Sequence, residues 1–315
     1  MSEEAKSFTC HTFAGLALDP IHVGTGGSRL GRVDNTIVRD PATQIPKIPG
    51  SSLAGVMRAY VAMAKDKYPQ CAGQGLGDKG HCRQTSCAVC AVFGFAKGQG
   101  DQGGFAGLAG FSDMQVLLFP VPTRRGPLWL SSPQALEQAM PHHPTPKLSL
   151  PDDPLLYYNR YDRAEGSLNL GWLELPIASD QGSLEEVRQA LNGLKLPSSI
   201  SGYLALVPDR LFAQVVNSNL EVRTSVAIDP SRGAAEEGAL FTYEALPRHT
   251  VLTWDITCRN PKHFGRTDDE KAAVKSYTEI KDVVTSAHPY LEHLGIGGMG
   301  TRGMGRLRVL GEVQA

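Results

Sequence analysis

A cysteine-rich segment that is poor in apolar residues, 66–104, constrains the fold of this chain more than any other feature of its sequence. Such a segment buries too little apolar surface to fold alone, and a bound metal ion could supply the missing stabilisation. Cys87-x-x-Cys90 has the knuckle spacing in which two thiolates bind one tetrahedral ion. We therefore predict a structural zinc site, with either His81 or Cys71 as the fourth ligand. The candidate ligands are Cys71, His81, Cys82, Cys87 and Cys90.

Other interpretations of these cysteines are weaker. A disulfide is uncommon in a cytosolic chain. A redox Cys-x-x-Cys motif is expected beside a thioredoxin-like βαβ unit, which is absent from the surrounding sequence. The simplest alternative is a loop with adventitious cysteines. Four thiolate or imidazole ligands leave no open coordination position, so we expect no catalytic zinc here.

Apolar patterns on both sides of the cysteine segment predict an α+β fold. Residues 8–18 alternate like a half-buried strand, and a helix capped by Ser51 or Ser52 follows, with its apolar residues on one face. A capping box of Ser183 and Glu186 predicts a second helix. We expect further strands over 105–121, 251–258 and 307–310, a helix around 211–216, two extended runs over 220–246, and a Pro-rich irregular stretch over 122–170.

The order βαβ…βαβ, with strands near both ends, suits a ferredoxin-like sheet with insertions. We predict a ferredoxin-like domain, a zinc-binding insertion and a third region with a β-hairpin. The ferredoxin-like domain comprises 1–65, 105–199 and 248–315, the insertion 66–104, and the hairpin region 200–247.

Composition excludes several classes of protein. The chain of 315 residues is 41% hydrophobic and 20% charged, as in an ordinary globular protein rather than a disordered one. No apolar run is long enough to cross a membrane, and the start of the chain does not resemble a signal peptide. We therefore expect a cytoplasmic protein with no membrane partner. The net charge of −1 argues against a bulk nucleic-acid coat but not against a local basic groove.

Two glycine-rich loops carry arginine, one near each end of the chain. Segment 21–64 holds five basic residues against two acidic ones, a local net charge of +3, and no acid lies between 294 and 311. Glycine lets backbone N–H groups approach phosphates closely, so the loops suit a sugar–phosphate backbone if they meet on adjacent strands. Ordinary turns with solvated arginines are an equal alternative. Both Gly98-x-Gly100-x-x-Gly103 and Gly295-x-Gly297-x-x-Gly300 lack the context of a dinucleotide site.

Asp34 is an acid among arginines, directly after the loop that contains His22. A carboxylate repels phosphate, so Asp34 is unexpected in a phosphate-binding loop unless it has a specific role. Asp34 either forms a salt bridge, or holds a divalent cation, or acts as a base toward a ribose 2′-hydroxyl. His22 is either a general acid or a structural residue.

Two glycine-rich stretches have recognisable patterns. The first comprises Ile21-His22-Val23-Gly24-Thr25-Gly26, Gly31-Arg32-Val33-Asp34-Asn35 and Ile48-Pro49-Gly50-Ser51-Ser52-Leu53-x-Gly55, and the second is Gly297-Gly298-Met299-Gly300-Thr301-Arg302-Gly303-Met304-Gly305-Arg306. They resemble the N-terminal signature and the C-terminal glycine-rich loop of the RAMP superfamily of CRISPR-associated proteins. The central stretch over 219–224 and 236–240 is similar to the thumb of the repeating backbone subunit of type III-B (Cmr) effectors.

The resemblance implies a ferredoxin-like, RRM-derived palm that lines up in a filament along CRISPR guide RNA, with a thumb hairpin between guide and target. Its partners would be guide RNA, single-stranded target RNA, copies of itself and other type III subunits. Target RNA would be cut at regular intervals with a divalent cation such as Mg or Mn. The catalytic aspartate of the family falls on Asp34 and its loop histidine on His22.

The resemblance also suggests further contacts. Where the family often has a basic residue, this chain has Ala54, which shifts the expected guide contact to Arg58 and the N–H groups of Ser51 and Ser52. Glu236 or Glu237 matches an acidic thumb position. The expected RNA-binding residues are Gly24, Gly26, Arg29, Arg32, Arg39, Ser51, Ser52, Arg58, Arg223, Gly298, Gly300, Arg302, Gly303 and Arg306.

Three alternatives stay open at this point. The subunit could bind RNA without cutting it, it could belong to the type III-A (Csm) group, or it could process guide RNA as a ribonuclease of the same superfamily.

Overall fold

The computed structural model describes residues 6–26, 33–73, 81–96, 104–142, 148, 150, 156–157, 166–178, 181–264 and 271–313. Its chain divides into two compact units. The first comprises Met1–Phe13, Pro49–Met114 and Trp254–Leu294, and the second comprises Ala14–Ile48, Gln115–Thr253 and Gly295–Ala315. Both contain helices and strands, which confirms the predicted α+β class.

The first unit holds helix α1 (Gly50–Ala64) and the cysteine segment. Leu53, Met57 and Tyr60 of α1 are buried, as the apolar pattern predicted. The predicted serine cap is wrong, because α1 begins after Pro49 and the N–H of Gly50 donates to a carboxylate oxygen of Asp113 at 2.8 Å. The other elements of this unit are α2 (Ala88–Phe93), β2 (Gly94–Phe95), β3 (Phe105–Ala106), β4 (Ala109–Phe111), a 3₁₀ helix η3 (Pro261–Phe264), α7 (Tyr277–Thr285) and α8 (His288–His293).

The second unit contains a mixed sheet in the order β14-β1-β13-β5-β6-β10-β7-β9-β8. Its strands β1 and β13 also extend into the first unit, where β13 pairs with β4. Strand β1 is buried at every position over 12–17, so the predicted half-buried alternation is wrong for this end of an inner strand. The strands are β1 (Phe8–Ala17), β5 (Gln115–Val121), β6 (Leu128–Ser131), β7 (Leu156–Tyr157), β8 (Ser167–Leu170), β9 (Leu173–Ala178), β10 (Leu204–Leu206), β13 (Val251–Arg259) and β14 (Leu307–Glu312).

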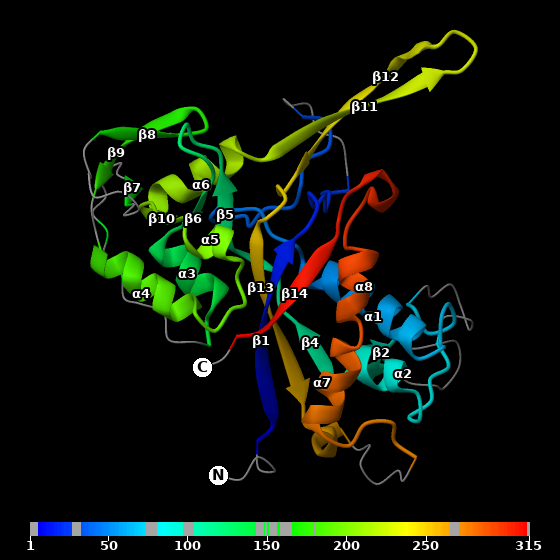
Figure 1. Cartoon of the computed structure of the whole chain (residues 1–315). Coiled ribbons are helices and arrows are strands. Elements are labelled where there is room, and N and C mark those ends of the chain that lie inside the picture. The colour runs from blue at the N-terminus through cyan, green and yellow to red at the C-terminus, as the bar shows by residue number, and fades with distance from the viewer. Residues whose placement is uncertain are drawn as a thin grey trace. The chain divides into compact units, whose positions relative to one another are not determined.

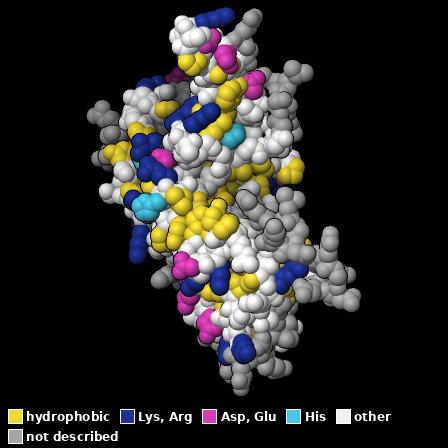
Figure 2. Space-filling view, turned by 90° about the vertical axis from the view of Figure 1, so that its right-hand side faces the viewer, with side chains coloured by type: hydrophobic (Ala, Val, Ile, Leu, Met, Phe, Trp, Pro, Cys, Tyr) yellow, Lys and Arg dark blue, Asp and Glu magenta, His cyan; other side chains and the backbone are white. Residues whose placement is uncertain are grey.

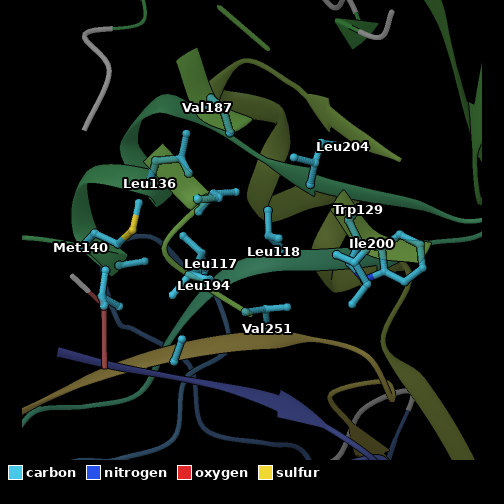
Figure 3. Close-up of a cluster of buried hydrophobic side chains, with 14 of the residues drawn as sticks. Leu117, Leu118, Trp129, Leu136, Met140, Val187, Leu194, Ile200, Leu204 and Val251 are labelled. Carbon is cyan, nitrogen blue, oxygen red and sulfur yellow. The ribbon is translucent and has the colours of Figure 1, made fainter. Parts of the chain in front are cut away.

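Helices α3 (Pro133–Ala139), α4 (Gln181–Leu191) and α5 (Ser198–Ser201) pack against the strands of the second unit (Figure 1). Their apolar side chains meet those of β5, β6 and β10 in one core, as the close-up shows (Figure 3). The prediction of an irregular stretch over 122–170 is partly wrong, because β6 and α3 lie there and Ser132 caps α3. Helix α4 begins at Gln181, which places Ser183 inside its first turn, so the predicted capping box is also wrong.

A long hairpin projects from the second unit (Figure 1). Helix α6 (Asp209–Ser218) leads into β11 (Glu221–Asp229), which pairs with β12 (Ala234–Ala245) in the antiparallel arrangement predicted for 220–246. The projecting part at the top of Figure 2 shows hydrophobic side chains among charged ones. Its exposed large apolar residues are Val222, Val226, Ile228 and Leu240.

Candidate functional site

His22 lies buried in the second unit and is held through its ring. Its Nδ1 is 2.6 Å from the backbone carbonyl oxygen of Glu244. Because a carbonyl oxygen only accepts, Nδ1 carries the proton and Nε2 is left to act as an acceptor while the ring is neutral. The edge of the ring also contacts Tyr243 at 5.8 Å between centroids. A Cβ atom at position 24 would lie 3.0 Å from Nε2, so Gly24 leaves space beside that nitrogen.

The two glycine loops meet at His22. The N–H of Gly298 donates to the backbone carbonyl oxygen of His22 at 2.8 Å. Gly297 has φ +92°, and a Cβ there would lie 2.4 Å from the same oxygen. Only glycine fits so close an approach. The loop near the start of the chain and the loop near its end are thus adjacent, which is the condition under which the sequence suits them to a sugar–phosphate backbone.

Asp34 is exposed, and Thr242 of strand β12 holds its carboxylate. Its Oδ2 accepts hydrogen bonds from the backbone N–H of Thr242 at 2.7 Å and from the Thr242 hydroxyl at 2.9 Å. These two bonds lower the pKa of Asp34 below its usual range. Among the described residues no hydrogen bond reaches Oδ1 of Asp34. The arrangement therefore presents an exposed, ionised carboxylate whose Oδ2 is held by Thr242.

Glu244 organises the segment that follows Asp34. One oxygen of its carboxylate accepts from the Arg39 guanidinium at 2.8 Å and from the backbone N–H of Ile37 at 3.3 Å. Arg39 also donates to Asn217 at 2.8 Å. Thr242 and Glu244 could not be identified as site residues from local patterns, because Thr242 lies 208 positions from Asp34 in the chain and Glu244 lies two residues beyond Thr242. Arg39, expected to contact RNA, forms this internal ion pair.

The other arginines that we expected to bind RNA lie in different environments. Arg306 forms a bidentate ion pair with Asp19, at 2.6 and 3.0 Å. Arg302 is exposed, with one contact of 3.4 Å to the hydroxyl of Ser225. Arg223 pairs with Glu221 at 2.5 Å. Gly26, Gly300 and Gly303 lie in the two loops, whereas Arg29 and Arg32 lie outside the described residues.

The hairpin carries the two acidic candidates near its tip. Glu236 is exposed on β12. Glu237 also belongs to this strand, but its side chain lies outside the described part of the structure.

Four cysteines of the first unit form a compact cluster. The sulfur atoms of Cys71, Cys82, Cys87 and Cys90 all lie within 4.8 Å of one another. Individual S···S distances are 3.7, 3.8 and 3.9 Å. A tetrahedral ion with Zn–S bonds of about 2.3 Å requires S···S edges of about 3.8 Å, so the cluster fits zinc. The hydrogen bond between Cys87 and Cys90 lowers the pKa of Cys87 and raises that of Cys90.

His81, the alternative to Cys71 as a predicted ligand, is not part of this cluster. Its Nδ1 accepts a hydrogen bond from the Arg58 guanidinium at 2.7 Å. Burial lowers the pKa of His81 most strongly, and the positive charges of Arg58 and Arg83 lower it further. The ring is therefore neutral. The fourth sulfur comes from Cys71 instead.

Arg58 is buried beside the cluster, although we expected it to contact RNA. Besides His81, its guanidinium donates to the carbonyl oxygens of Cys71 at 2.8 Å and Gly94 at 2.6 Å. These bonds tie helix α1 to the cysteine segment. Ser51 and Ser52 lie in the first turn of α1 rather than at its cap, and Ser51 is exposed there.

Comparison with known proteins places these features in a family. A sequence model of the RAMP superfamily matches residues 16–308. The chain is 26% identical over 305 residues to the CRISPR system Cmr endoribonuclease Cmr4 of Pyrococcus furiosus, an alignment that covers 93% of this chain and 92% of that protein.

Solved structures share the fold. The crystal structure of oligomeric Cmr4 from Pyrococcus furiosus matches with a TM-score of 0.62 and 19% identity, over 98% of this chain and 100% of that one. A chain of the type III-B Cmr-beta complex bound to cognate target RNA matches with a TM-score of 0.64 and 17% identity, over 97% and 99%. None of the helices in the described ranges is long and apolar enough to span a lipid bilayer.

Proposed function

The chain belongs to the RAMP superfamily, and on that premise we propose that it is a repeating backbone subunit of a type III CRISPR effector. In this role it binds guide RNA along a filament and cuts complementary target RNA at regular intervals. The similarity to Cmr4 over nearly the whole of both chains supports the Cmr group rather than the Csm group. Guide RNA, target RNA, further copies of the chain and other effector subunits are its proposed partners.

The observation that carries the proposed cleavage is the exposed, ionised carboxylate of Asp34. Its low pKa makes it a weak base but a good oxygen ligand. We propose that Oδ1 of Asp34 helps to hold a divalent cation such as Mg or Mn, and that RNA phosphate oxygens complete the ligand set. Such a cation would supply charge stabilisation at the scissile phosphate and at the attacking 2′-hydroxyl.

His22 and the glycine loops position the RNA in this proposal. The Nδ1–H bond to Glu244 fixes the ring, so the Nε2 atom faces the space beside Gly24 in a defined orientation. Backbone N–H groups of the loops that contain Gly26, Gly300 and Gly303 are suited to phosphate oxygens. Arg302 adds an exposed positive charge to the C-terminal loop.

We further propose a structural zinc ion held by Cys71, Cys82, Cys87 and Cys90. The ion would stabilise the insertion 66–104, while the palm comprises 1–65, 105–199 and 248–315. The thumb is the region 200–247, which contains hairpin β11–β12. Zinc with four thiolates has no open position, so its role is in folding rather than in cleavage.

Reconstitution of the effector with Asp34→Ala tests the function. Guide and target RNA should still bind in a gel-shift assay, while metal-dependent cutting of labelled target should disappear. Glu185→Ala, which removes an exposed acid on α4, is the matched control and should cut like the wild type. Undiminished cutting by Asp34→Ala would contradict the catalytic assignment.

Two further outcomes would favour other functions. A wild-type complex that assembles on RNA but never cuts it would favour a purely structural subunit. Cutting of precursor repeat RNA by the isolated chain would favour guide processing.

A further inference from the structure

Arg58 is the one lysine or arginine that is buried among the residues described in the structure, with 8% of its surface exposed. It lies on helix α1 directly after Met57, within the buried face of that helix. A cation is rarely buried without an anion close to it, because its charge loses the hydration that stabilises it in water. We therefore looked for a negative partner of this guanidinium.

No carboxylate in the described ranges forms an ion pair with Arg58. All three guanidinium nitrogens donate instead to neutral acceptors. Nε donates to the carbonyl oxygen of Cys71 at 2.8 Å, Nη1 to that of Gly94 at 2.6 Å, and Nη2 to Nδ1 of His81 at 2.7 Å. These bonds satisfy the donors and fix the plane of the group, but neutral acceptors do not offset its charge.

The cysteine cluster lies directly beside the guanidinium. Nη2 of Arg58 is 4.0 Å from Sγ of Cys90, which in turn is 3.7 Å from Sγ of Cys82 and 3.8 Å from Sγ of Cys71. Cys71, Cys87 and Cys90 are buried. Four thiolates around one Zn²⁺ carry a double negative charge, and such a charge is costly to bury unless a cation is close. The buried arginine and the metal centre therefore each supply the charge that the other lacks.

Packing holds the arginine in this position. A Cβ atom on Gly73 would lie 3.2 Å from Cδ of Arg58, so the aliphatic part of the side chain passes close to that backbone. Gly94, whose carbonyl oxygen accepts from Nη1, is itself fixed against strand β3, because a Cβ atom there would lie 2.4 Å from the carbonyl oxygen of Phe105. The positive charge thus has a defined place beside the sulfur atoms.

We infer that Arg58 is the counter-cation of the metal centre, and that its charge raises the affinity of the four cysteines for zinc. This inference rests on the zinc ion proposed above, and it assigns to helix α1 a role in holding that ion. His81 takes part indirectly, because its Nδ1 accepts from the nitrogen that faces Cys90. Groups that contact metal ligands in this way commonly change metal affinity when they are replaced.

Competition for Zn²⁺ between the full-length chain and a coloured chelator tests the inference. Arg58→Gln keeps N–H donors but removes the charge, and it should weaken zinc binding about 10-fold or more. Arg58→Lys keeps the charge but not the planar fork, and it should retain most of the affinity. Arg210→Gln, which removes an exposed charge on α6, is the matched control and should bind zinc like the wild type. Circular dichroism at saturating zinc reports whether each variant is folded.

Co²⁺ in place of zinc supplies a second measurement that hydrogen bonding alone would not change. The sulfur-to-cobalt charge-transfer band should move to lower energy in Arg58→Gln, because loss of a nearby positive charge raises the energy of the sulfur electrons. In Arg58→Lys the band should stay near its wild-type position. An unmoved band in Arg58→Gln would contradict the inference.

The remaining outcomes also decide the question. Weaker zinc binding in Arg58→Gln than in Arg58→Lys, or an unfolded Arg58→Gln beside a folded Arg58→Lys, supports the counter-cation. Two variants that bind zinc like the wild type, or that are impaired or unfolded alike, overturn it. A wild-type chain that binds no zinc would remove both the proposed ion and this inference, whereas the cutting of target RNA that we assign to Asp34 has its own assay.

Discussion

Three hydrogen bonds connect Thr242 with Asp34 and so join the catalytic candidate to strand β12. The backbone N–H and the hydroxyl of Thr242 donate to Oδ2 of Asp34, and the backbone N–H of Asp34 donates to the hydroxyl oxygen at 3.1 Å. Two residues further along β12, the backbone carbonyl of Glu244 holds His22. The base of one hairpin strand therefore positions both candidates.

Thr242→Val should reduce target cutting about 10-fold, because it removes the hydroxyl that orients Asp34 but keeps the β-branched shape. The hydroxyl lowers the pKa of Asp34, so its loss raises that pKa toward 3.8. The decline in cutting rate on the acidic side should then begin at a higher pH. A pH–rate profile of the reconstituted complex measures this shift. Thr242→Ser keeps the hydroxyl and should behave like the wild type; equal profiles for all three would show that the hydroxyl plays no part.

Cys71→Ser should abolish zinc binding to the chain, whereas His81→Gln should retain one bound ion. The reason is that Cys71 belongs to the sulfur cluster and His81 accepts a hydrogen bond from Arg58 instead. Metal content of the purified chains, measured by mass spectrometry, checks both variants. Cys258→Ser serves as the control, because Cys258 is buried away from the cluster. Retention of zinc by Cys71→Ser together with its loss from His81→Gln would reverse our assignment of the ligand.

Gly297→Ala and Gly55→Ala should change stability in opposite directions. Gly297 has φ +92° and faces the carbonyl oxygen of His22, so a methyl group there is strained and should cost about 1–3 kcal/mol. Gly55 lies inside helix α1 with no atom within 4 Å of a Cβ, so alanine should stabilise by about 0.5–1 kcal/mol. Urea unfolding of both variants measures the two signs. An unchanged midpoint for Gly297→Ala would mean that the loops do not meet as described.

His288 should make stability depend on pH. Burial lowers its pKa from 6.5 to about 4, and its ring packs edge-on against Phe13 and Trp254. The unfolded chain therefore takes up this proton at a higher pH than the folded chain. The free energy of unfolding should be highest above pH 6.5 and fall by about 1.4 kcal/mol per pH unit as the pH decreases toward 4.

His288→Phe should remove this part of the slope, because phenylalanine does not titrate. Urea unfolding at several pH values measures it, with His293→Phe at an exposed position as the control. A slope that persists in His288→Phe would assign the pH dependence to other groups.

Local patterns in the sequence determined the elements whose signals are contained in a few neighbouring residues. The face of α1 that carries Leu53 and Met57 follows from helical spacing, and the hairpin follows from two extended runs around a turn. The same approach failed at Ser183 and over 122–170. In these regions, helices form because their apolar side chains pack against β5 and β10, although the local sequence and its prolines favour other structures.

The sequence by itself also determined which chemistry the chain carries: a close set of cysteines, an aspartate among arginines and two glycine loops. Only the tertiary structure decided which groups meet. It brought Cys71 rather than His81 to the cluster, and it placed Thr242 and Glu244 against Asp34 and His22. These choices depend on contacts between residues far apart in the chain, and such contacts arise from the packing of whole elements. The periodicity and residue spacing of a short segment do not indicate these long-range contacts.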